Sequence, residues 1–352
     1  MNVEGLVREM RWQGVSLGEA GISVEVTDTD GGPAVELVTG FPVGGGVEDA
    51  LRTRVREALA PAPLAGFRCR ARIVPHEPQP PLSPSPRIRN IVAVGSGKGG
   101  VGKSTTAVNL ALALAADGAR VGILDADVYG PSIPTMLGLS GKPESPDGKS
   151  IVPMRAHGIE AMSIGLLVEH DTPMIWRGPM ATQALTQLLT QTLWGGEEGL
   201  DYLVVDLPPG TGDIQLTLAQ KIPVAGAIVV TTPQEVATMD ARKALKMFEK
   251  VQIHVLGLVE NMAVHVCSQC GHAEHVFGSG GGERMAAQYG VPLLGSLPLE
   301  LAIREQGDAG VPVVASAPES TAAQAYRETA RALAVRLAMR PRAPRPIAAS
   351  LA

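Results

Sequence analysis

The chain has 352 residues, a length that predicts about two domains. Its 3 cysteines are too few for a disulfide framework, and their odd number favours a reducing compartment in which thiols serve another purpose. A net charge of -5 argues against a protein built mainly to bind nucleic acid or anionic lipid. The N-terminus lacks a signal-peptide pattern and no segment reaches about 18 uninterrupted apolar residues, so we expect a cytoplasmic protein that does not enter the membrane.

The first part of the chain, residues 1–74, reads as a small α+β domain. Alternating apolar residues and turn residues predict three strands and one helix in it, at 22–27, 34–38, 67–74 and 47–59 respectively. Six prolines then fall within residues 75–90 and favour an extended, semi-rigid linker. The linker therefore separates this small domain from the rest of the chain.

Residues 91–340 have the pattern of an α/β domain. Short apolar runs alternate with helical segments, which predicts a mostly parallel sheet with helices on both faces. The expected strands are 91–94, 121–124, 202–205, 227–230 and 254–258, and the clearest helices are 104–116 and 235–250. The last residues, 341–352, are expected to form a disordered tail.

The first strand of this domain runs into GKGGVGKS, which matches the phosphate-binding pattern G-x-x-x-x-G-K-[ST] at every fixed position. Four glycines let backbone N–H groups approach a polyphosphate, while Lys103 neutralises it and Ser104 holds Mg²⁺. The following helix adds the positive end of its dipole. The sequence therefore predicts an ATP site that includes Gly97, Lys98, Gly99, Gly100, Val101, Gly102, Lys103, Ser104 and Thr105.

Lys98 stands at a variable position of this pattern, where phosphate binding within one chain needs no charge. The stretch KGGVGKST resembles the deviant Walker A sequence of a large family that includes nitrogenase iron protein and the Min and Par positioning ATPases. The resemblance implies that Lys98 reaches across a homodimer interface and stabilises charge on the partner's nucleotide, as an arginine finger does. It also implies that Asn261 contacts adenine. The alternatives are a solvated surface lysine and an ordinary loop-capping asparagine.

Three aspartates end predicted strands at the edge where open α/β sheets bind ligands. Phosphoryl transfer to water needs a metal beside the phosphates and a group that orients the water. The resemblance assigns Asp125 and Asp206, with Ser104, to magnesium, and Asp127 to the hydrolytic water. Lys98, Lys103 and Asp127 are thus the expected catalytic residues. Helix capping is the alternative for the aspartates, and the loop 208–212 is expected to sense the γ-phosphate.

Cys267 and Cys270 form a C-x-x-C pair, whose thiolates can bind one metal centre. A redox disulfide is less suited to a position away from a helix N-terminus. A mononuclear zinc site would add His272 or His275, although the spacing is short for zinc. Buried structural thiols are a further alternative. A [4Fe–4S] cluster usually takes four thiolates, which two copies of this pair would supply without Cys69.

Several motifs together resemble the Mrp/ApbC/NBP35 family of ATP-dependent iron–sulfur carrier proteins over residues 87–340. They are the phosphate loop, DADVYGPS, WRGPM at 176–180, DYLVVDLPPGTGD, the cysteine pair followed by GH and FG, and LPLELAIREQGDAGVP. The resemblance implies an ATPase that forms a homodimer, binds a labile bridging cluster and delivers it to apo-proteins, with a cluster-assembly scaffold as a further partner. Residues 1–74 loosely resemble the MIP18-like module of many bacterial members, and a scaffold or docking role is expected for them.

Two other functions are compatible with parts of this pattern. A positioning ATPase of the Min or Par type would need a membrane-binding helix or a basic surface for DNA. Residues 321–339 have helical periodicity, but their apolar stripe is typical of a core-facing helix. An electron-transfer ATPase like nitrogenase iron protein would take its cluster ligands from separate positions, whereas this chain has a close pair.

Overall fold

The computed structural model describes residues 2–167, 178–267 and 269–344. A single large sheet organises the part of the chain that follows the small N-terminal region. Within the described residues this sheet has eight strands, and β8 alone runs antiparallel to its neighbour β9. This confirms the predicted α/β fold with a mostly parallel sheet. In spatial order the strands are β15 (Leu293–Ser296), β12 (Val255–Glu260), β11 (Gly226–Thr231), β6 (Ile88–Ser96), β10 (Leu200–Asp206), β7 (Val121–Asp125), β9 (Ile159–Ser163) and β8 (Met154–Ala156).

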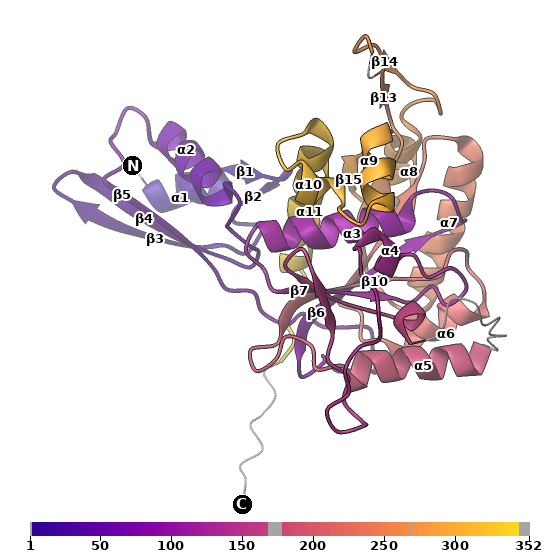
Figure 1. The fold of residues 1–352 in the computed structure, drawn as a ribbon. Helices are drawn as coiled ribbons and strands as arrows, with labels where there is room; N and C mark the ends of the chain where they lie inside the picture. The colour runs from indigo at the N-terminus through magenta and orange to yellow at the C-terminus, as the bar shows by residue number, and fades with distance from the viewer. Residues whose placement is uncertain (1, 168–177, 268, 345–352) are drawn as a thin grey trace, which may run out of the picture.

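Helices cover both faces of this sheet because its strands are apolar on both sides (Figure 1). Along β6, Val92 and Val94 join one buried cluster, whereas Ile91 and Ala93 join the other. The first face carries α3 (Lys103–Ala116), α4 (Ile133–Met136), α9 (Leu301–Asp308), α10 (Val313–Ser316) and α11 (Thr321–Ala338). The second carries η1 (Ile164–Leu166), α5 (Gly178–Gln191), α6 (Asp213–Lys221), α7 (Glu235–Lys250) and α8 (Gly281–Tyr289).

The N-terminal region forms a second, smaller sheet in the order β3-β4-β5, with helices packed on one side. Its elements are α1 (Val3–Glu9), β1 (Arg11–Trp12), β2 (Val15–Ser16), β3 (Ser23–Thr29), β4 (Gly32–Thr39), α2 (Val47–Leu59) and β5 (Gly66–Ala71). The helix predicted at 47–59 and the strands predicted at 22–27 and 34–38 are confirmed. The last predicted strand ends earlier, at Ala71. The buried side of the sheet continues into the cluster under α3 and α11.

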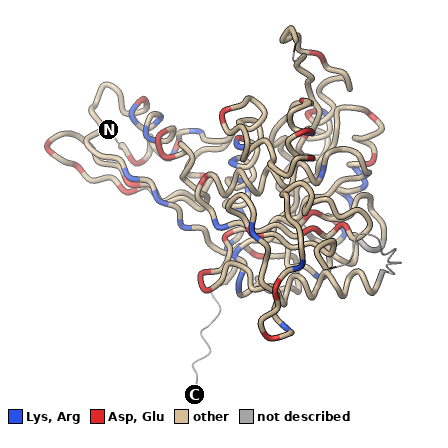
Figure 2. Tube along the Cα trace, viewed as in Figure 1, with Lys and Arg blue, Asp and Glu red and all other residues tan. Residues whose placement is uncertain are grey.

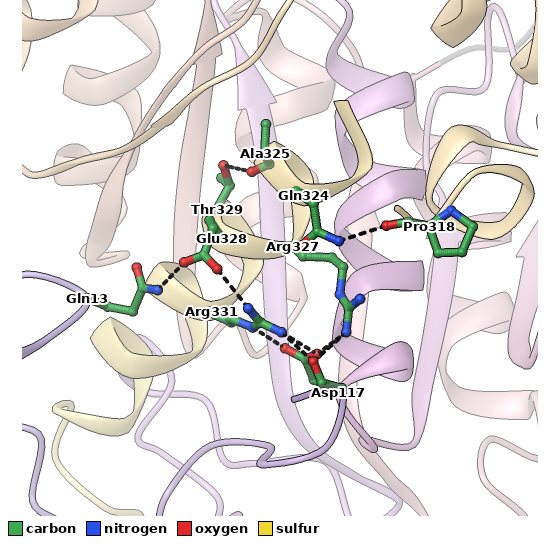
Figure 3. A network of polar contacts seen from close by, with 10 residues as sticks. Gln13, Asp117, Pro318, Gln324, Ala325, Arg327, Glu328, Thr329 and Arg331 are labelled. Atoms are coloured by element: carbon green, nitrogen blue, oxygen red, sulfur yellow. Dashed lines mark hydrogen bonds and ion pairs between the residues drawn. The ribbon is translucent and has the colours of Figure 1, made fainter. Parts of the chain in front are cut away.

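An ion-pair network at the end of α3 and along α11 in the larger region (Figure 3) also hydrogen-bonds the small region. Asp117, at the end of α3, is 3% exposed and accepts from Arg327 and Arg331 of α11. Both arginines also donate to the backbone oxygen of Gly45, at 2.8 Å each. The backbone of Gly44 completes the contact by donating to the Asp117 carbonyl at 2.7 Å. These three hydrogen bonds to Gly44 and Gly45 hold the loop before α2 against α11 and the end of α3.

Charged residues of both signs are distributed along the chain in both regions, as Figure 2 shows. No helix within the described ranges is long and apolar enough to cross a membrane. The predicted tail lies partly outside the described residues, which end at 344. Of the WRGPM motif, Trp176 and Arg177 also lie outside them, and the rest begins α5.

Candidate functional site

The phosphate loop lies between β6 and α3, as the sequence predicts. Gly100 and Gly102 both have φ near +78°, a left-handed conformation that favours glycine. A Cβ at Gly97 would lie 2.0 Å from the carbonyl carbon of Asp240, so the loop lets α7 approach closely. The glycines are therefore required by the backbone path and by packing, and they leave the loop amides accessible.

A pocket of about 220 Å³ opens in front of the loop. The structure brings most of the predicted phosphate-binding residues to its walls, together with Pro209 of the predicted sensing loop. Its lining includes Lys98, Gly99, Gly100, Gly102, Lys103, Ser104, Thr105 and Asp127. Gly97 and Val101 lie behind it: Gly97 contacts α7, and the Val101 side chain is buried in the core.

Asp206 and Asp125 lie beneath this pocket, at paired positions in the neighbouring strands β10 and β7. Asp206 is fully buried, and its Oδ1 accepts from the Lys103 ammonium at 2.5 Å. Its Oδ2 has no hydrogen-bond partner among the described residues. Burial raises the pKa of Asp206, and Lys103 opposes that rise. The site thus holds an unused carboxylate oxygen next to the lysine of the loop.

Asp125 is also fully buried, but hydrogen bonds surround it. The backbone amides of Asp127, Ser132 and Ile133 donate to its carboxylate, as does the hydroxyl of Ser163 at 3.1 Å. Burial, followed by repulsion from Asp206, raises the pKa of Asp125 to about 7. Asp127 differs because it is half-buried and reaches the pocket wall. The three predicted carboxylates are therefore adjacent, and Asp127 is the one that faces the open space.

A second, more apolar cavity of about 320 Å³ adjoins the first and shares Gly102, Thr105 and Met136 with it. Asn261 lines it, and its amide donates to the Val101 carbonyl in the phosphate loop at 2.9 Å. This bond joins positions 160 residues apart, so Asn261 does not act as a local loop cap. The remaining lining comes from α4, α9, α11, the segment before α9 and the segment after β12, and includes Met136, Met262, Pro298, Leu299, Glu300, Ile303 and Tyr326.

The cysteine pair lies on a short hairpin of β13 (His265–Val266) and β14 (Ala273–Glu274), which stands away from the body at the top of Figure 1. Cys267 is half-buried and Cys270 is exposed. The backbone amides of Gln269 and Cys270 lower the pKa of the Cys267 thiol, which favours the thiolate that binds metals. Buried structural thiols therefore do not describe this pair.

The hairpin is tied to the walls of the apolar cavity. Its strand follows β12 through Asn261, and Ala263 donates to the Leu297 carbonyl at 2.9 Å. The His265 imidazole bonds the Leu299 carbonyl at 2.9 Å. The ring nitrogen Nδ1 of His275, a candidate zinc ligand, contacts the Ala263 carbonyl at 2.7 Å. In the described ranges, no three His, Cys, Asp or Glu side chains gather as a metal site.

Cys69 is far from this hairpin in the fold, in β5 of the small region. It is buried, and burial raises the pKa of its thiol to about 12. Sequence reasoning did not find Ser163, which hydrogen-bonds Asp125, because no motif marks it. Ser163 meets Asp125 only because β9 pairs with β7 at that register. Sequence reasoning also did not find Tyr326 in the lining of the apolar cavity, because no local motif marks it.

Comparisons with known proteins match most of this chain to one family. A protein-family model of the ParA group, described as NUBPL iron-transfer P-loop NTPase, matches residues 87–334. The iron-sulfur cluster carrier protein of Pseudomonas fragi is 61% identical over 260 residues, covering 73% of this chain and 90% of that protein. The iron-sulfur cluster transfer protein NUBPL of Mus musculus is 51% identical over 264 residues, covering 74% and 82%.

One solved structure adds a bound ligand to the comparison. The nucleotide-binding protein of Archaeoglobus fulgidus, in complex with ADP, is 39% identical with a TM-score of 0.55. The match covers 64% of this chain and 87% of that one. A family model that spans most of the chain and a relative with 61% identity lead to the same assignment. The chain belongs to the NUBPL-type iron-transfer family of ParA-like P-loop NTPases.

Proposed function

We propose that this protein binds and hydrolyses ATP, carries a labile [4Fe–4S] cluster, and transfers that cluster to apo-proteins. One observation carries the proposal. The cysteine pair, half-buried at Cys267 and exposed at Cys270, lies on a hairpin that continues from Asn261, and Asn261 hydrogen-bonds the phosphate loop. A nucleotide pocket and a thiol pair are thereby joined through a single segment of chain. The carrier names of the relatives support the same function.

The two adjoining cavities suit the two halves of a nucleotide. The polar pocket has loop amides and two lysines for the phosphates, and the apolar one suits a base and ribose. Asn261 lies in the apolar cavity, where it would contact adenine. Residues 97–105 would hold the phosphates, with Lys103 turning from Asp206 toward the β and γ oxygens. The Archaeoglobus relative is described in complex with ADP, which supports nucleotide binding by this chain.

The residues near the loop fit a magnesium ion. Its preferred ligands are oxygen atoms, which Ser104, Asp125 and Asp206 supply directly or through water. The unpartnered Oδ2 of Asp206 is such an acceptor. When bound, magnesium would neutralise charge on the phosphates. Asp206 then needs no pairing with Lys103, which frees the lysine for the nucleotide.

Hydrolysis would use the residues that face the open side of the pocket. Asp127 is positioned to orient the attacking water, because it lies on the pocket wall with Ser104 and Lys103. Lys98 would stabilise the charge that develops on the nucleotide of a second chain. We infer a homodimer for this reason and for an independent one: each chain offers two cysteines on its hairpin, and a protein-bound [4Fe–4S] cluster usually takes four.

The small region and the cysteine it contains have a different role in this proposal. Residues 1–74 would be a scaffold or docking domain, residues 75–90 its connection, and 91–340 the ATPase and carrier domain. A buried thiol with a raised pKa is a poor cluster ligand, so Cys69 takes no part. We further propose a cytoplasmic location, with apo-proteins and a cluster-assembly scaffold as partners.

A transfer assay tests the proposed function directly. Protein reconstituted under anaerobic conditions with iron and sulfide is mixed with an apo-enzyme that needs a [4Fe–4S] cluster. We expect the enzyme to regain activity in proportion to the carrier added, and Cys267→Ala carrier to restore none. Equal reactivation by wild type and variant would overturn the proposal. A positioning ATPase or a zinc-stabilised ATPase would give no transfer with either protein.

A further inference from the structure

The proline-rich segment between the two regions is packed against the body of the protein. His76 is buried, and its imidazole bonds the Asn90 side chain at 2.9 Å. The Pro75 carbonyl accepts from Ala343 at 3.0 Å, near the C-terminal end of the described chain. β6 begins at Ile88, inside the segment predicted as linker. This segment therefore contacts several distant parts of the chain. One of its contacts is with α6, the helix that follows the loop at the phosphate pocket.

That contact is made by Gln79, which is 4% exposed. Its amide nitrogen donates to the Ala219 carbonyl at 2.6 Å and to the Ile222 carbonyl at 2.7 Å. Its amide oxygen accepts from the backbone of Val224 at 2.9 Å. A helix end leaves carbonyls without intrahelical partners, and Gln79 satisfies that of Ala219 and adds a second donor to that of Ile222, which also accepts from Val224. One buried side chain thus fixes this end of the helix with three hydrogen bonds.

The opposite end of α6 lies beside the phosphate pocket. The loop before it includes Pro209 on the pocket wall, and Gly210 donates to the Ser96 carbonyl at 3.1 Å. In this half of the helix, Gln215 is 1% exposed, and neither atom of its amide has a partner in the described part of the chain. Burying an unpaired amide costs free energy. In the absence of a ligand, the N-terminal half of α6 therefore contains an unsatisfied polar side chain.

We propose that Gln79 is a positioning residue for hydrolysis, which anchors α6 so that filling the phosphate pocket moves only the helix end that holds Gln215. The inference rests on the proposed function, because it needs a nucleotide in the pocket. With the C-terminal end fixed, a small displacement of the 207–212 loop turns the helix about Gln79. This rotation brings the Gln215 amide to a hydrogen-bond partner. Without the anchor the helix would slide as a whole, and the loop would settle less accurately around the γ-phosphate.

Hydrogen exchange on the wild-type protein tests whether ligand binding affects the N-terminal end of α6 more than its C-terminal end. Amide exchange is compared without ligand and with Mg²⁺ and a non-hydrolysable ATP analogue, after calorimetry has established that the analogue binds. We expect exchange in 210–217 to slow at least about tenfold and the Val224 amide to change less than about twofold. Equal changes along the whole helix would overturn the proposal. If the analogue does not bind, the proposed function fails, and the proposal that depends on it fails as well.

Variants of Gln79 test its role in the reaction. Gln79→Glu keeps the acceptor for Val224 and loses both donors to α6, and Gln79→Met loses all three bonds at similar length. For both we expect kcat for ATP to fall about tenfold, with KM for ATP and Kd for ADP within about twofold of wild type. Gln324→Glu is the matched control, since this half-buried glutamine lies outside α6 and its amide donates to the Pro318 carbonyl.

Two results of the variant experiment would contradict the proposal. One is a kcat for both Gln79 variants equal to that of Gln324→Glu. The other is a loss of ADP affinity as large as the loss of kcat, which would indicate general damage to the fold. Should one variant fail to fold, the remaining one and the exchange measurement on wild type still decide the question.

Discussion

The phosphate loop and the cysteine hairpin differ in how firmly the protein holds them. In the loop, glycines allow close packing against α7, and a buried lysine pairs with a buried aspartate. The hairpin has two-residue strands and exposed or half-buried cysteines. A site that stabilises charge in phosphoryl transfer gains from fixed geometry. A site that releases its cargo gains from access, so the contrast matches a motor and a carrier in one chain.

Removing Lys103 is expected to give the largest effect and to act on the first region alone. Lys103→Ala should lower the rate of ATP hydrolysis about 1,000-fold, because the charge that neutralises the phosphates is lost. It also leaves Asp206 buried and unpaired, which should reduce the free energy of unfolding by about 3 kcal/mol. Steady-state kinetics and urea unfolding measure both. Loss of reconstituted iron in this variant would break the separation between the two regions.

Removing either cysteine of the pair is expected to act on the second region alone. Cys267→Ala and Cys270→Ala should abolish iron and sulfide binding, yet change the free energy of unfolding by less than about 0.5 kcal/mol, since the hairpin packs little. Cys69→Ala is the matched control. It should keep its iron and lose about 1 kcal/mol of stability, because its thiol is buried. Iron content after anaerobic reconstitution and urea midpoints distinguish the three variants.

Two glycines of the loop test how tightly the first region is built. A Cβ at Gly102 would lie 2.1 Å from the Asn261 amide nitrogen, at a positive φ, so Gly102→Ala should cost about 2 kcal/mol or more. At Gly99 no described atom lies within 4 Å of the added Cβ. Gly99→Ala should therefore stay within about 0.5 kcal/mol of wild type. Similar urea midpoints for the two variants would contradict the packing described above.

The buried carboxylates predict a small dependence of stability on pH in the absence of nucleotide and magnesium. The pKa of Asp125 in the folded protein is about 7, above its ordinary value of 3.8. A carboxyl group whose pKa is raised by folding stabilises the folded state at low pH. This contribution is lost as the pH rises through about 7. We therefore expect the urea midpoint to fall as the pH rises from about 3.8 to about 7, and to fall less steeply in Asp125→Asn. The pKa of Asp206 is also raised and accounts for the remaining slope. An identical slope in both proteins would contradict the assignment.

Much of the fold follows from local sequence. The helices at 47–59 and 235–250 have the predicted ends, because each combines a spaced apolar face with clear boundaries. The strands around the phosphate loop were predictable from their continuous apolar runs. The short elements α1, β1 and β2 were not predicted, since pieces of this length have little periodicity.

The chemistry of the site was less accessible where it depends on long-range contacts. Lys103, Ser104 and the aspartates belong to local motifs, and their grouping follows from the parallel sheet. The partner of Asp117 in α11 and the contact of Gln79 with α6 join residues far apart in sequence. No local pattern marks such pairs, because register and packing of whole elements create them. The deep burial of Asp125 likewise became visible only in the folded structure.

The central claim is that two chains share one cluster through their cysteine pairs, and native mass spectrometry after anaerobic reconstitution measures this directly. We expect a dimer that carries one [4Fe–4S] cluster, and Cys270→Ala protein without any. Lys103→Ala should still form the clustered dimer, since its defect lies in the other region. A cluster on single chains, or zinc bound by one chain, would contradict the account.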